Sequence, residues 1–359
     1  MSRAVVLCAL AGACGHVHFT ASPDTPTTSD WWNTRWPYRQ PIVFDHAQVA
    51  ADQTDFPVLV TSPSDPGLAA HAQNRIAFTD ANNVVLAFEL ESLEPALVAW
   101  VNVPTLSATT DTTLYLYYGD ATAPDQSQPA NVWTNGFTGV YHFGDGTTLD
   151  VADSTGMNDA SSQGATAGAG QIRGAASFDG TADVAAPTTG LDTSAGAVDT
   201  VTFWLYFDGP FDAGPLAFVA TTGAVYDLWF EIDGCEGFNT GAGEVLGTTA
   251  SGLANRWLYV AAEFYNGLPQ AATGTQPGNA LYLDGAAQSL SFTCGPGTPN
   301  PVSVFATLDW GGNPGYHIHG RIDEGRFAVG ARSATWIATE YANQSSPATF
   351  ETFGPEQAQ

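Results

Sequence analysis

The sequence contains no lysine. Of its 359 residues, nine are basic, all of them arginine, and 36 are acidic, which gives a formal net charge of −27. So few cations cannot displace the counterions around nucleic acid phosphates, so we exclude nucleic acid as a partner, and anionic lipid surfaces are disfavoured for the same reason. The acidity fits a salt-rich environment that screens charge repulsion, or ordinary solubility combined with a codon usage that favours arginine.

Charged residues of either sign are scarce, at 13% of the chain, whereas glycine (38 residues) and proline (22 residues) are abundant. Many turn-forming residues with few charges indicate numerous short strands rather than helices. Aromatic residues make up 12% of the sequence, which argues against a disordered chain. The length allows two or three domains, each large enough to bury its own core.

The N-terminal apolar run, residues 4–13, is too short to span a bilayer. It follows Arg3, so residues 1–14 have the pattern of a signal peptide. Residues 11–14 (Ala-Gly-Ala-Cys) resemble the lipobox of bacterial lipoproteins, and this resemblance implies a lipid on Cys14. Lipidation, plain secretion and an incorrectly assigned start remain open. Residues 15–30, rich in Ser, Thr, Pro and Asp, are expected to be a flexible tether.

Cysteine is rare, with four residues. Cys8 would be removed with the signal and Cys14 would carry the lipid, which leaves Cys235 and Cys294. In an exported chain we expect this pair to form a disulfide. Because the loop is long, such a bond would stabilise the fold by about 4 kcal/mol on the chain-entropy argument. The sequence has no Cys-x-x-Cys spacing, which disfavours a metal site at this pair.

Residues 31–120 are expected to form a first β-sandwich. Short apolar-rich runs are separated by Pro, Asp, Asn and Gly turns, and period-two alternation marks some of them as half-buried strands. A set of motifs resembles a bacterial and archaeal β-domain of unknown function that often precedes LamG-like jelly rolls: residues 36–39, 54–59, 78–80, 98–104 and 114–119. The resemblance implies a fold but no activity.

The acidic residues of this first segment are interpreted as partners in structural ion pairs, because no Ser-His-Asp order or nucleophile elbow occurs. They include Asp52, Asp55, Asp80, Glu89 and Glu91. Residues 121–135 are rich in Pro and Gln and are expected to be a linker, which Val132 and Trp133 dock against a neighbouring domain.

Residues 136–353 are expected to form a second all-β domain, with residues 160–174 as a loop and 347–353 closing its sheet. Motifs in order resemble the LamG-like jelly roll of the concanavalin A-like superfamily: residues 139–143, 153–158, 176–180, 201–206, 281–285 and 320–327. That fold carries lectins, adhesion modules and glycosidases, so the resemblance does not select a function. Within 320–327, strand alternation places Ile322 and Glu324 on one face and Asp323 on the other.

One carboxylate motif has catalytic spacing. Glu231, Asp233 and Glu236 spell E-x-D-x-x-E, the spacing that laminarinase-type retaining glycosidases use on this fold. Nucleophile and acid would then lie about 5 Å apart. However, Asp233-Gly234 is typical of a hairpin turn, which would move Glu236 to the next strand. We therefore expect no catalytic residues and keep a laminarinase-like hydrolase as an alternative.

Jelly rolls of this superfamily often hold a structural Ca²⁺, and the resemblance implies such a site here. Asp323, Asp153 and Asp145 are its candidate ligands, because Ca²⁺ binds six to eight oxygens that Asp-rich and Gly-rich loops supply. The alternative is that Asp323 pairs with Arg321 or Arg326.

Two further features of the second segment suggest binding. Trp310 and Tyr316 lie on a glycine-rich stretch from which their rings would stack on a sugar. His317 and His319, with His142 elsewhere, have the spacing of a strand-borne metal pair, but the sequence shows no clear carboxylate partner, so we interpret them as hydrogen-bonded surface histidines.

The sequence therefore predicts an exported, two-domain all-β protein, anchored in the cell envelope by a lipid or secreted. It is expected to bind a glycan or another surface protein through jelly-roll loops, with no catalytic activity and with the membrane contacted only through the lipid. A structural spacer without a small ligand is the second alternative. The ligand and the oligomeric state are beyond one sequence.

Overall fold

The structure is a computed structural model that describes residues 31–62, 66–72, 75–208, 213–220, 224–231, 234–240, 244–292, 295, 297, 305–312 and 315–359. The expected signal peptide, the tether and Cys14 lie outside these residues, as do Asp233 and Cys294. Among the described residues, no helix is long and apolar enough to cross a membrane.

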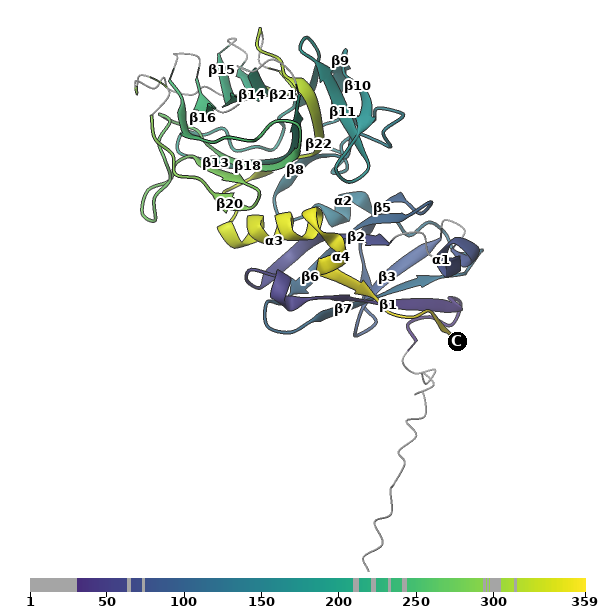
Figure 1. Cartoon of the computed structure of the whole chain (residues 1–359). Helices are drawn as coiled ribbons and strands as arrows, with labels where there is room; N and C mark the ends of the chain where they lie inside the picture. The colour runs from purple at the N-terminus through teal and green to yellow at the C-terminus, as the bar shows by residue number, and fades with distance from the viewer. Residues whose placement is uncertain are drawn as a thin grey trace, which may run out of the picture.

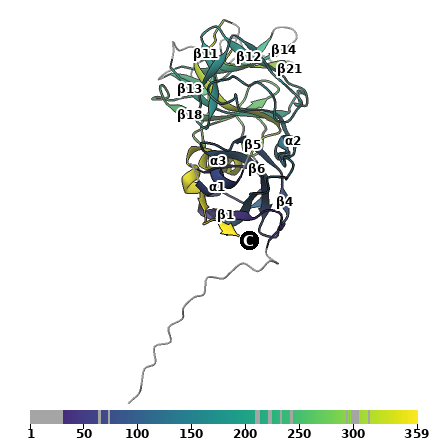
Figure 2. The same cartoon turned by 90° about the vertical axis from the view of Figure 1, so that its right-hand side faces the viewer.

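The fold is all-β, as predicted, and consists of two stacked sandwiches (Figures 1 and 2). In the first sandwich the larger sheet has the order β23-β1-β7-β3-β4, with β24 also on β1: β1 (Tyr38–Phe44), β3 (Ile76–Asp80), β4 (Val85–Leu86), β7 (Thr112–Tyr118), β23 (Glu351–Phe353) and β24 (Gln357–Ala358). The smaller sheet has the order β2-β6-β5: β2 (Gln53–Ser62), β5 (Phe88–Ser92) and β6 (Leu97–Leu106). Short helices lie in the connections: η2 (His46–Gln48), α1 (Pro66–His71) and α2 (Pro129–Val132).

The second sandwich also has two antiparallel sheets. The sheet that faces the first sandwich has the order β10-β11-β22-β13-β18-β19-β20, with β8 also on β22: β8 (Phe137–Tyr141), β10 (Thr166–Ala169), β11 (Gly174–Asp179), β13 (Val198–Phe207), β18 (Trp257–Tyr265), β19 (Ala280–Leu283), β20 (Ala286–Ala287) and β22 (His319–Val329). The outer sheet has the order β17-β16-β15-β14-β21-β12-β9: β9 (Ser161–Gln163), β12 (Asp183–Pro187), β14 (Ala213–Ala220), β15 (Val225–Phe230), β16 (Cys235–Asn239), β17 (Leu246–Thr249) and β21 (Phe305–Trp310). The expected loop 160–174 thus contains β9, all of β10 and the first residue of β11.

The C-terminal segment belongs to the first sandwich, not to the second as the 136–353 boundary predicted. After β22 the chain forms α3 (Ala334–Ser345) and α4 (Pro347–Phe350), and β23 then pairs with β1, Ile42 opposite Phe353. Figure 1 shows the C-terminus beside β1. β23 occupies the edge of the sheet beside β1, and sequence periodicity cannot assign that position to a remote strand.

The two sandwiches are in buried apolar contact, with α3 lying between them (Figure 1). Trp336 and Ile337 of α3 pack in the same apolar cluster as Phe56 of the first sandwich and Trp204 and Tyr259 of the second. Ser333 caps the helix by accepting a hydrogen bond from the Trp336 amide at 3.0 Å, which fixes where α3 starts. The linker helix α2 ends in this cluster too, since Val132 and Trp133 are buried there.

A β-bulge in β22 changes which side chains face the first sandwich. Thr202 pairs with Arg326 but Trp204 pairs with Asp323, so Glu324 and Gly325 both lie opposite the single residue Phe203. Glu324 has φ 53°, a left-handed conformation that non-glycine residues rarely adopt. The predicted alternation is therefore wrong at this point: Glu324 and Asp323 both turn toward the first sandwich, while Ile322 lies in the second core.

Candidate functional site

The proposed E-x-D-x-x-E catalytic set is contradicted by the hairpin of β15 and β16. Phe230, a core residue, pairs with Glu236, which is fully buried inside the second sandwich. Glu231 lies on the opposite face, where its Oε1 accepts the Trp229 indole N–H at 3.3 Å. Two carboxylates on opposite faces of a sheet cannot flank one glycosidic bond, and Asp233 lies outside the described residues.

Of the two predicted sugar-stacking residues, only Tyr316 reaches the surface. Trp310, the last residue of β21, is fully buried and packs against Tyr141, Phe143 and Phe203, so its prediction as a ligand residue is wrong. Tyr316 is 54% exposed, and its ring meets the edge of Trp229 with centroids 5.3 Å apart. Trp229 itself is half-buried.

The loop that carries Tyr316 is tied to the outer sheet. The Gly214 amide donates to the Tyr316 carbonyl at 3.0 Å, and Gly214 forms a bridge with His317. The His317 ring in turn lies 3.5 Å from an Asp183 carboxylate oxygen on β12. Next to Asp183, burial raises the pKa of Asp309 to about 6, with Asp183 adding to the effect. This aromatic site is made of Tyr316, Trp229 and Glu231, and His317, next to Tyr316 in the chain, links it to Asp183 on β12 of the same sheet.

The three expected calcium ligands have protein partners. Asp153 accepts hydrogen bonds on both oxygens, among them the amides of Val140 and Asn158. Asp145 caps its own turn through the Thr147 hydroxyl and amides of Thr147 and Thr148, which lower its pKa to about 2. Asp323 is fully buried, and its Oδ2 accepts the amides of Gln171 and Ile172. Calcium binding stays a prediction.

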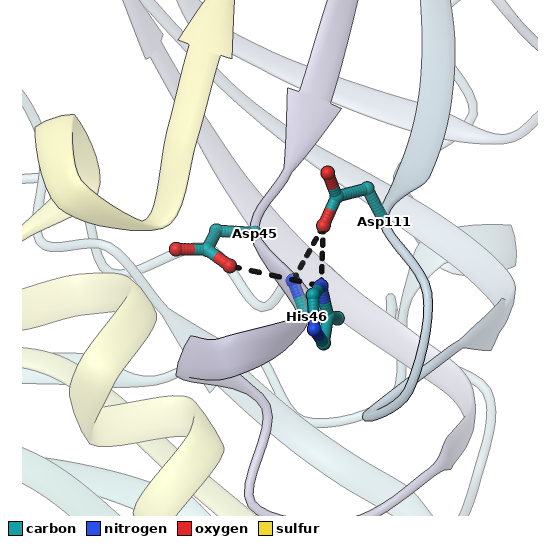
Figure 3. A group of neighbouring side chains, drawn as sticks. All are labelled: Asp45, His46 and Asp111. Carbon is teal, nitrogen blue, oxygen red and sulfur yellow. Dashed lines mark hydrogen bonds and ion pairs between the residues drawn. The ribbon is translucent and has the colours of Figure 1, made fainter.

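Two groups of described residues have the composition and spacing of a metal site. The first, Asp45, His46 and Asp111, lies on the surface (Figure 3), with the side chains 42–52% exposed. His46 Nδ1 is 2.6 Å from Asp111 Oδ1 but 3.9 Å from Asp45 Oδ1. The bond to His46 lowers the pKa of Asp111, and Asp45 caps η2, so this group is explained by local structure.

The second group, Glu91, His142 and Glu324, lies between the sandwiches. Glu89 and Glu91 alternate on β5 with Phe88, which is buried in the first core, so both carboxylates face β22. His142 follows β8 and points back at them. Its Nδ1 is 2.9 Å from Glu324 Oε1 and 3.4 Å from Glu91 Oε1, and its Nε2 is 3.2 Å from Glu89 Oε2.

Indole, hydroxyl and guanidinium donors hold each carboxylate in place. Trp133 and Ser154 each donate to Glu89 at 2.6 Å, and Trp100 donates to Glu91 at 2.6 Å. The guanidinium of Arg326 stacks on Trp100. It forms an ion pair with Glu324 at 2.5 Å and a second one with Glu340 of α3 at 2.7 Å. Every donor comes from a different segment, so the geometry depends on the two sandwiches staying in contact.

Burial and charge shift these groups in different directions. Burial would raise the pKa of Glu89, but the His142 imidazolium and the bonds from Ser154 and Trp133 lower it to about 2. Burial raises the pKa of Glu91 to about 7, despite the attraction of His142. Burial alone would lower the pKa of His142, yet Glu324, Glu91 and Glu89 hold it well above its usual value.

A pocket of about 560 Å³ opens beside this group. Its lining combines Glu89, Glu91 and His142 with Asp150, Asp153, Ser154 and Arg173. Sequence reasoning missed this interdomain site, because His142 had no visible partner and Glu89 and Glu91 were interpreted as members of structural ion pairs with arginine. The alternation Glu89-x-Glu91 on a strand was the one available signal.

Residues 72–157 match the domain of unknown function DUF2341. The DUF2341 segment starts within the expected first domain and continues through the linker and β8, so the boundary at residue 120 does not mark its end. It contains Glu89, Glu91 and His142 but not Tyr316. No curated protein matches the chain.

Several solved structures are similar at low identity. Domain 4 of an extracellular arabinanase from Geobacillus stearothermophilus, in complex with arabinotriose, is 18% identical with TM-score 0.44, covering 58% of this chain and 98% of that chain. A Trypanosoma rangeli sialidase is 13% identical with TM-score 0.43, covering 68% and 42%. The binding domain of botulinum neurotoxin serotype D is 11% identical with TM-score 0.41, covering 58% and 52%. This chain thus spans about half the length of the latter two.

Proposed function

We propose that this is an exported protein that binds a neutral glycan at the aromatic site of its second, jelly-roll domain and breaks no bond in it. The observation that carries the proposal is Tyr316. Among the exposed large apolar side chains of the described residues it is the one aromatic ring, and Trp229 supports it from the side.

The chemistry of the aromatic site suits a sugar. One face of a pyranose ring is lined with C–H groups and stacks on an aromatic ring, while its hydroxyls need hydrogen-bond partners at the rim. We assign this role to Glu231, which contacts Trp229, and to His317, which follows Tyr316 in the chain. A tyrosine on an anchored loop loses little conformational entropy when it binds, since only two side-chain torsions are fixed.

The charge of the protein selects among glycans. The aromatic site contains Glu231, while Asp183 and Asp309 lie on strands β12 and β21 of the same sheet, and the whole chain carries a net charge of −27. Sialylated or uronic acid-rich glycans would be repelled, most strongly at low salt. A neutral glycan is therefore the substrate class we propose.

Binding of the full-length protein to an array of neutral glycans, followed by calorimetry on the best ligand, tests the proposal. Tyr316→Ala and Trp229→Ala are expected to weaken binding at least about tenfold, equal to about 1.4 kcal/mol. Leu268→Ala is the matched control, since Leu268 is 53% exposed on another loop. Release of reducing sugar would contradict the non-catalytic role. The site would be refuted if Tyr316→Ala bound the glycan as tightly as the wild type does. It would also be refuted if the wild type bound no glycan, a result that would favour a structural spacer.

Export and lipidation form the second part of the proposal and rest on the N-terminal sequence pattern. Mass spectrometry of the protein recovered from its native envelope fraction is expected to find Cys14 as an acylated N-terminal residue. An unprocessed Met1 in cytoplasmic material would contradict export.

A further inference from the structure

In the interdomain group of Glu91, His142 and Glu324, one carboxylate oxygen has no hydrogen-bond donor among the described residues. The Glu91 side chain is 6% exposed, and its Oε2 accepts no hydrogen bond from any described residue. A buried carboxylate oxygen without a donor is costly, because burial removes the water that would otherwise bind it. Glu91 is also one of the residues that line the 560 Å³ pocket, so this buried carboxylate lies next to a space that a small ligand can enter.

The charges around Glu91 leave room for a cation. Five carboxyl groups surround the site: Glu89, Glu91, Asp323, Glu324 and Glu340. They face the guanidinium of Arg326 and the imidazole of His142, and Arg173 adds one more cation in the pocket lining. A buried cluster with this excess of acids is stabilised by a bound cation, either a proton or a metal ion.

The distances between the potential ligand atoms fit a metal ion. Two ligand atoms bound to one transition metal at about 2.1 Å lie roughly 3.0–3.4 Å apart. His142 Nδ1 is 2.9 Å from Glu324 Oε1 and 3.4 Å from Glu91 Oε1. One ligand atom from each of the three residues lies within 4.8 Å of the others.

The second nitrogen of His142 makes the bond that metal-binding histidines usually make. Its Nε2 is 3.2 Å from Glu89 Oε2, and Glu89 is itself fixed by Trp133 and Ser154 at 2.6 Å. In the neutral imidazole that a metal binds in exchange for a proton, a carboxylate that accepts the Nε2–H leaves Nδ1 free to bind the metal. Trp100 and Arg326 orient Glu91 and Glu324 in the same way.

The geometry points to a divalent transition-metal site formed by Glu91, His142 and Glu324, with Glu89 orienting the histidine. One imidazole and two carboxylates suit Zn²⁺ or Mn²⁺, whereas Ca²⁺ binds oxygen only. The remaining coordination positions open to the pocket, so the ion would keep exchangeable water. Because Glu91 belongs to the first sandwich and His142 and Glu324 to the second, the ion would join the two sandwiches.

Titration of the chelator-treated, full-length protein with Zn²⁺ against a chromophoric chelator tests this site. We expect one site with Kd below about 1 μM. Glu91→Gln and His142→Gln should each weaken it by about 10- to 100-fold, and Glu89→Gln by about tenfold through the outer-shell effect. His46→Gln is the matched control, because the exposed Asp45–His46–Asp111 group of Figure 3 is the other cluster of this composition among the described residues.

Co²⁺ provides a second readout that does not depend on affinity. Its visible absorption bands should appear in the wild type and in His46→Gln and should be lost in His142→Gln. Near-ultraviolet circular dichroism without metal shows whether each variant is folded, and Glu89→Gln, which keeps all three ligands, serves if a ligand variant is not. The site is refuted if Zn²⁺ at 100-fold excess leaves the wild type unbound, or if His46→Gln abolishes binding while His142→Gln does not.

Discussion

Glu351 offers a direct test of how the C-terminal segment is held. It starts β23, which pairs with β1 in one sheet, while its Oε1 accepts the amide of Thr61 on β2 in the other sheet at 2.7 Å. Its Oε2 accepts no hydrogen bond from the described residues. The side chain therefore links both sheets of the first sandwich to a segment that follows the second sandwich in sequence.

Burial raises the pKa of the Glu351 carboxyl from 4.5 to about 8, although the bonds from Thr61 oppose the rise. The folded protein therefore keeps a proton that the unfolded chain releases above pH 4.5, so stability declines as the pH rises from about 5 to above 8. Each pKa unit corresponds to about 1.4 kcal/mol, so the ionised carboxyl destabilises the fold by on the order of 3–5 kcal/mol.

Glu351→Gln keeps the neutral form at every pH. At pH 9 we expect the variant to be more stable than the wild type by on the order of 3–5 kcal/mol, and at pH 5 to differ by less than about 1 kcal/mol. Urea unfolding followed by tryptophan fluorescence at pH 5, 7 and 9 measures this. Glu356→Gln, exposed on the same segment, is the control. If Glu351→Gln loses stability between pH 5 and 9 as steeply as the wild type, the reasoning is wrong.

Other measurements test further parts of the structure. The wild type should be more stable near pH 5 than near pH 8, because burial also raises the pKa values of Asp199 and Glu263 to about 7. A melting temperature that does not change with pH would contradict this. Arg326→Met leaves Glu324 and Glu340 buried without their cation and should cost about 3–5 kcal/mol of stability, so a loss below about 1 kcal/mol would count against the pairing. Gly247→Ala would bring a Cβ to 2.1 Å from the Glu236 carbonyl oxygen and should lower the melting temperature, whereas Gly274→Ala, with nothing within 4 Å, should not; equal effects would contradict the packing of β16 and β17. Peptide mapping without reductant should recover Cys235 linked to Cys294, and two free thiols would refute the disulfide.

The aromatic and interdomain sites differ in how far sequence could reach them. The exposed position of Tyr316 was predicted, because an aromatic residue beside glycines indicates a ring on a surface loop. The same reasoning was wrong for Trp310, because this residue is the last of β21 and the alternation along that strand places its side chain in the core. His142 lies 53 residues from Glu89 and 182 from Glu324, and no local pattern records which remote strands will meet.

Sequence alone determined the all-β class and the local hairpins, since alternation and turn residues act over a few neighbouring positions that the backbone itself couples. Asp233-Gly234 thus correctly predicted the β15–β16 hairpin that separates Glu231 from Glu236. Only the tertiary structure decided that β23 completes the first sandwich and that a bulge turns Glu324 toward His142. It also decided that the Glu91 carboxylate is buried away from solvent. Those outcomes depend on which apolar faces bury one another, a choice made by the whole chain at once.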